Sequence, residues 1–193
     1  MKNRLLAFVG ALVVLGMAAT PLWAHPGHEA PGLAGGIMHP FTGLDHLLAF
    51  VGAGIWLARL DKRRAIGAAA ALIGALLVGA VLGASELMAG IEPMLAITVV
   101  LVGLVIVCAV ELPLPVFIAM FIAFGLFHGA AHGAELSSRQ VSTLLGIVLG
   151  STCLLGVGWT GGKALRRLVG ESSVELAGGG IAAAGLAMLV SAI

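Results

Sequence analysis

Six side chains able to bind a metal ion fall in two short stretches of an otherwise apolar sequence. They are His39, Asp45 and His46 in "HPFTGLDH", and His128, His132 and Glu135 in "FHGAAHGAE". Imidazole nitrogens and carboxylate oxygens without thiolates suit nickel, cobalt or zinc better than copper(I), magnesium or calcium. The two stretches therefore indicate a site for a borderline divalent cation.

The spacing of these residues predicts two polar stripes. His132 and Glu135 follow His128 by four and seven residues, so the three share one face of an α-helix. His39 and His46 are seven residues apart, and a continuous helix would place them on a similar stripe with Asp45 beside the second. An alternative interpretation of "TGLD" is a helix capping box, in which Asp45 satisfies backbone donors. Capping and metal binding can coexist at one residue.

The composition is that of a membrane protein. The 193 residues are 60% hydrophobic and only 10% charged, and the mean hydropathy is +1.14. Apolar stretches of about 20 residues predict an all-α polytopic protein. The six predicted transmembrane helices cover residues 39–58, 65–84, 94–110, 115–134, 141–160 and 174–192. The lipid bilayer is the expected partner, and nucleic acid is not, because basic runs are absent.

The N-terminal residues have the pattern of a secretory signal. Lys2 and Arg4 precede a short apolar run and then small residues up to Ala24, so residues 1–24 are predicted to be a cleaved signal peptide. An uncleaved anchor is the alternative. Residues 25–38 would then be a flexible periplasmic segment rich in His, Pro and Gly, followed by the transmembrane domain at 39–193. His25 and His28 in that segment suit either a loose metal-capture arm or a solvated tail.

The basic residues predict the orientation, because Lys and Arg accumulate in cytoplasmic loops. One cluster follows the first predicted span and the other follows the fifth: Arg59, Lys62, Arg63 and Arg64, then Lys163, Arg166 and Arg167. With an exported N-terminus, both clusters are cytoplasmic and both mature termini face the periplasm. The first and fourth spans then run in opposite directions, so the two histidine stripes should meet near the periplasmic face.

Together, "HPFTGLDH" and "FHGAAHGAE" resemble the two signatures of the HupE/UreJ family of nickel and cobalt permeases. The resemblance extends to the leader, the six spans and the total length. It implies import of Ni²⁺ or Co²⁺, as substrate and not as a prosthetic group, across the bacterial cytoplasmic (inner) membrane. The metal would supply urease, hydrogenase or cobalamin synthesis. The resemblance also implies that Asp45, His46, His128 and His132 take part in transport, with His39 and Glu135 completing the motifs.

The predicted function is a secondary transporter or channel-like permease rather than an enzyme, with a His/Asp/Glu site formed by the first and fourth spans. One alternative is an intramembrane zinc-dependent hydrolase, in which His and Asp hold zinc and activate water. The sequence lacks the HExxH arrangement, and the first and fourth spans contribute no obvious serine near the cluster. A membrane metal sensor or storage protein is the other alternative; it would bind metal tightly and move none.

Overall fold

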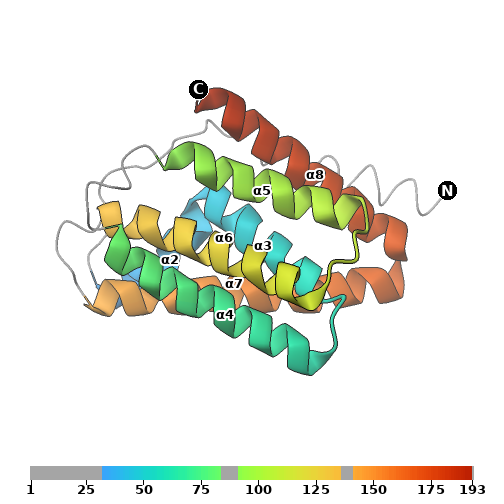
Figure 1. The fold of residues 1–193 in the computed structure, drawn as a ribbon, viewed down its shortest axis with the longest axis horizontal. Helices are drawn as coiled ribbons and strands as arrows, with labels where there is room; N and C mark the ends of the chain where they lie inside the picture. Colours follow the sequence, from blue (N-terminus) through green and yellow to red (C-terminus); the bar gives the residue numbers. More distant parts are fainter. Residues whose placement is uncertain (1–31, 84–90, 136–140, 193) are drawn as a thin grey trace.

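The computed structural model describes residues 32–83, 91–135 and 141–192, without the side chains of residues 92, 134 and 135. Its regular structure is entirely helical (Figure 1), which confirms the predicted all-α class. The helices are α2 (Leu33–Thr42), α3 (Leu44–Leu57), α4 (Lys62–Leu82), α5 (Glu92–Val107), α6 (Leu114–Glu135), α7 (Val141–Leu168) and α8 (Glu171–Ser191). The predicted signal peptide lies outside the described residues.

Four of these helices are long and apolar enough to cross a membrane, namely α4, α6, α7 and α8. Helices α2 and α3 together form a fifth candidate, which is bent by 81° at its break. Helix α5 is apolar but has 16 residues, a rise of roughly 24 Å against a hydrocarbon core of about 30 Å. The described part of this multi-pass membrane protein thus has four or five candidate spans, fewer than the six predicted.

Helix α5 ends earlier than the predicted span over residues 94–110. Ala109 adopts a left-handed conformation with φ of 49°, which stops the helix. The N–H of Val110 turns back and donates to the carbonyl of Val105 at 3.1 Å, as in a Schellman ending. The apolar sequence continues past the helix, and for this reason hydropathy alone overestimates its length.

The break between α2 and α3 follows from Pro40 and Gly43. Pro40 lies inside α2 and has no N–H for a helical hydrogen bond, and the helix ends two residues later. The Thr42 hydroxyl donates to the His39 carbonyl at 2.9 Å. Gly43, with φ of −78° and ψ of 117°, is extended and precedes α3. The single straight helix predicted over residues 39–58 is therefore wrong.

Helix α2 also includes residues that were predicted to be irregular. Residues 33–38, the end of the predicted flexible segment, are helical because they pack along α7. The N–H of Gly32 donates to Thr143 Oγ1 at 3.0 Å, and the Gly36 Cα faces the backbone carbonyl of Thr143. Packing on α7 therefore stabilises a short helix that sequence periodicity did not reveal.

Small residues join the helices in tight pairs (Figure 1): α4 with α6, α5 with α8, and α2–α3 with α7. Within each pair, glycines lie directly against the partner backbone. A Cβ on Gly129 would collide with the Leu76 carbonyl of α4, and one on Gly158 would collide with the Val51 carbonyl of α3. Small residues allow such approach in lipid, where packing drives helix association. We call these glycine-lined contacts between paired helices seams. The seams set the positions of the helices that carry the histidines.

Both basic clusters lie at the same end of the bundle. The Arg59 guanidinium donates to the Ile106 carbonyl at 3.0 Å, which joins the end of α3 to the end of α5. Gly162 of α7 packs on Ala58, so the basic end of α7 lies there too. His46 occupies the first turn of α3 and therefore lies toward the opposite end.

Candidate metal site

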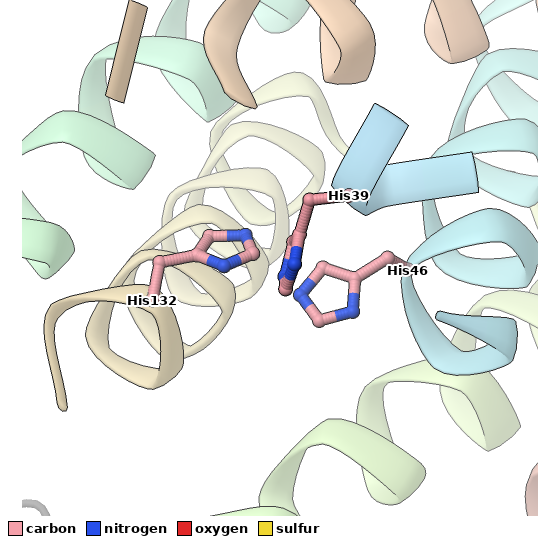
Figure 2. A group of neighbouring side chains, drawn as sticks. All are labelled: His39, His46 and His132. Carbon is pink, nitrogen blue, oxygen red and sulfur yellow. The ribbon is translucent and has the colours of Figure 1, made fainter. Parts of the chain in front are cut away.

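Three imidazoles converge from three helices: His39 from α2, His46 from the first turn of α3, and His132 from the last turn of α6. Figure 2 shows the three rings pointing toward one another. Their centroids lie 4.5 Å apart for His46 and His132, 4.7 Å for His39 and His132, and 5.3 Å for His39 and His46. One nitrogen from each ring can be chosen so that all three lie within 4.8 Å of one another. We call this group the histidine triad.

The bend between α2 and α3 brings His39 and His46 together. Residues seven apart on a straight helix are separated by roughly 10 Å along its axis, whereas these rings have centroids 5.3 Å apart. The predicted stripe along one helix is thus replaced by two rings facing each other across an 81° turn. The two histidine motifs do meet, as predicted, because the ring of His46 contacts those of His128 and His132.

The triad is largely shielded from the surroundings. His46 and His132 are each 1% exposed. Within the described part of the chain, neither ring nitrogen of His132 has a hydrogen-bond partner. A buried polar atom without a partner costs about 1–3 kcal/mol. A cation bound by the triad would offset that cost, because each neutral imidazole offers a lone pair to a metal.

His128 lies one helical turn from His132 on the unbroken α6, as their spacing predicted, and both residues are 1% exposed. Its ring centroid is 5.1 Å from that of His46, but its nitrogens are outside the triad. His128 Nδ1 lies 3.0 Å from the Phe124 carbonyl oxygen. Because a carbonyl only accepts, Nδ1 carries the proton and Nε2 of the neutral ring keeps its lone pair.

Asp45 lies beside the triad rather than within it. Its Oδ1 is 2.9 Å from Nδ1 of His46, and its side chain is 16% exposed. A carboxylate at this position favours the tautomer with the proton on Nδ1, which leaves Nε2 of His46 for a metal. The arrangement needs Gly43, because a Cβ there would lie 2.9 Å from Asp45 Oδ1 and 3.0 Å from His46 Nδ1.

Phe50 is a residue of the site that the sequence argument missed. It is 2% exposed, and its ring centroid lies 6.5 Å from that of His46 and 5.4 Å from that of His128. The signal was its position one helical turn after His46. Phe50 therefore borders the histidines on the side facing the basic end of the bundle.

The structure does not describe the side chains of three predicted ligands. His25 and His28 belong to the segment before residue 32, and the side chain of Glu135 is not described although its backbone closes α6. Their contribution to metal binding stays a prediction.

Comparison with known proteins identifies the family. The chain matches the HupE / UreJ protein family over residues 12–188. It is 36% identical over 172 residues to Protein HupE of Rhizobium leguminosarum bv. viciae, covering 86% of this chain and 89% of that protein. No solved structure gives a significant match. Proteins of this family are generally considered transporters rather than enzymes. The chain therefore belongs to the HupE/UreJ family.

Proposed function

We propose that this protein is a secondary transporter or channel-like permease that imports Ni²⁺ or Co²⁺ across the bacterial cytoplasmic membrane. The observation that carries the proposal is the histidine triad, three imidazoles from α2, α3 and α6 with nitrogens within 4.8 Å of one another. Membership of a family generally considered to be transporters supports movement of the ion rather than its storage.

The chemistry of the triad supports a borderline cation as the substrate. Three neutral imidazoles suit Ni²⁺, Co²⁺ or Zn²⁺, whereas Mg²⁺ and Ca²⁺ prefer oxygen ligands. Asp45 next to His46 adds a negative charge that favours a dication over an uncharged ligand. Transport also requires that the ion can leave the triad, so binding there must be weak enough for release.

In the proposed arrangement the chain crosses the membrane six times, with the bent pair α2–α3 as the first crossing and α5 as the third. The basic end of the bundle faces the cytoplasm and the triad lies toward the periplasm. Helix α5, with 16 residues, is short for a span. Local bilayer thinning accommodates such a mismatch at modest cost.

The test is uptake of Ni²⁺, Co²⁺ and Zn²⁺ by proteoliposomes containing the full chain. We expect His46→Ala and His132→Ala each to lower the initial rate by at least about tenfold. Disturbing a residue that only supports a ligand already costs about 10–100-fold, and these two rings are proposed as ligands themselves.

Thr152→Ala is the matched control for this experiment. Thr152 is exposed on α7, where its hydroxyl donates to the Val148 carbonyl at 2.7 Å, so uptake should be unchanged. Uptake at the unmutated rate by both histidine variants would show that the triad is not the transport site. Failure of the unmutated protein to move any of the three metals would refute the proposed function.

A further inference from the structure

The chain of histidine rings extends beyond the triad. His46 contacts three other rings, at centroid distances of 4.5 Å to His132, 5.1 Å to His128 and 5.3 Å to His39. A nitrogen ligand lies about 2.0–2.1 Å from a metal such as zinc, so two nitrogens that share an ion are separated by at most about 4.2 Å. The triad needs only a small adjustment to satisfy this limit, and His128 is outside it.

His128 nevertheless has the features of a ligand. Its Nδ1 donates to the Phe124 carbonyl, which fixes the ring and leaves the lone pair on Nε2. Metal-binding histidines commonly donate their other ring nitrogen to a carbonyl in this way. Nε2 is buried and has no hydrogen-bond partner among the residues that the structure describes. This nitrogen can therefore bind a metal ion, but an ion held by the triad is out of its reach.

An ion bound by His128 would lie deeper in the bundle. Along α6, His128 is one turn closer to the basic end than His132, a step of roughly 6 Å. Along α3, Phe50 is one turn deeper than His46, and its ring contacts both His46 and His128. An ion between His46 and His128 would therefore lie below the triad, with Phe50 beneath it.

We propose that His46 and His128 form a second, deeper position for a borderline divalent cation, with His46 shared between the two positions. This inference rests on the proposed function. An ion bound by the triad keeps His46, releases His39 and His132, and gains Nε2 of His128. All four imidazoles stay neutral throughout, so the step exchanges ligands without transferring a proton. Sharing one ligand lets the ion move inward without leaving the protein.

The first test measures binding and does not depend on transport. Ni²⁺ binding to the purified full chain is followed by equilibrium dialysis, and the imidazoles around the metal are counted by X-ray absorption. In the variant lacking both His39 and His132, we expect weaker binding with two imidazoles. Adding His128→Ala should abolish the remaining binding. Unchanged binding after that addition would overturn the second position.

The second test separates the two positions by their effect on transport. His132→Ala should lose most Ni²⁺ binding, whereas His128→Ala should keep triad binding within about a factor of two, which is RT ln 2 in free energy. In proteoliposomes, however, His128→Ala should lower uptake by at least about tenfold, as expected for a residue that acts on the metal path. Equal loss of binding in both variants, or unmutated uptake by His128→Ala, would contradict the proposal.

Two further variants keep these tests interpretable. His128→Gln retains a polar side chain in the buried space and replaces His128→Ala if the latter does not elute as a monodisperse species. Thr98→Val removes a buried hydroxyl on another helix, α5, and should change neither binding nor uptake. If the unmutated protein binds Ni²⁺ but does not transport it, the proposed function fails while the binding test of the second position still gives a result.

Discussion

Helix α6 meets two of its neighbours in opposite ways. Against α4, glycines bring the two backbones into contact, with Gly129 facing the Leu76 carbonyl and Gly79 facing the Leu126 carbonyl. Against α3, by contrast, Cα atoms rarely approach within 8 Å. Large buried rings fill the space on that side, and they are Phe50, Trp56, Phe117, Phe121 and Phe124.

The rings between α3 and α6 separate the histidines from the basic end of the bundle. Trp56 lies 4.2 Å from Phe117 and 5.4 Å from Phe121 between ring centroids. His128 follows Phe117 by eleven residues, a rise of roughly 16 Å along the helix. A cation cannot enter such an apolar region without a large desolvation cost. The comparison shows that backbones fix the contact between α4 and α6, whereas side chains fill the interface between α3 and α6 below the histidines.

The largest effect should come from a change in the glycine seam. Gly129→Leu places a bulky side chain where even a Cβ would overlap the Leu76 backbone, so the pair cannot pack and we expect no folded protein. Gly74→Leu is the control, because a Cβ at Gly74 has no atom within 4 Å among the described residues. Folded yield is measured by size-exclusion chromatography in detergent. Equal yields for the two variants would remove the contrast between the seam and the rest of the bundle.

A smaller effect is expected from the ring-filled interface. Phe121 is fully buried, and Phe121→Ala should leave a cavity without moving either backbone, so the protein still folds. The free energy of unfolding should fall by about 3–5 kcal/mol, as for other buried phenylalanines. Ile122→Ala, next to it but 39% exposed, is the matched control and should cost less. Thermal unfolding in detergent compares the two. Loss of folding in Phe121→Ala would show that this interface tolerates substitution as poorly as the glycine seam.

The sequence predicted the regions that depend on local pattern. Hydropathy located α4, α6, α7 and α8, because long apolar runs are helical wherever they pack. The four-residue spacing of His128 and His132 placed both rings on one face of a helix, since α6 has no break between them. These predictions needed no knowledge of neighbouring helices.

The regions that depend on contacts between helices were not predicted. Pro40 and Gly43 were visible in the sequence, but the 81° bend also needs α7, against which α2 packs through Gly36. His39 and His46 do meet, across that bend and not along a helix face. The early end of α5 at Ala109 was missed for a related reason, because a left-handed residue within an apolar run leaves no trace in hydropathy.

The smallest effect should come from Gly43, whose role differs from that of the seam glycines. Its φ of −78° suits any residue, so it is needed only for space. A Cβ at Gly43 would meet side-chain atoms, 2.9 Å from Asp45 Oδ1 and 3.0 Å from His46 Nδ1, and these can shift by a few tenths of an ångström. We therefore expect Gly43→Ala to fold normally but to lower metal uptake by about tenfold, the lower end of the usual loss when a supporting partner of a metal ligand is disturbed.

Gly67→Ala on α4 is the control for Gly43→Ala, because a Cβ there has no described atom within 4 Å. Its uptake should be unchanged, and it should gain about 0.5–1 kcal/mol of stability, as alanine does over glycine inside a helix. Uptake and thermal unfolding are measured on both variants. If Gly43→Ala loses stability together with uptake, then Gly43 acts as another seam glycine. If it loses uptake alone, the space beside Asp45 and His46 serves transport, and Gly43 positions a ligand rather than holding two helices together.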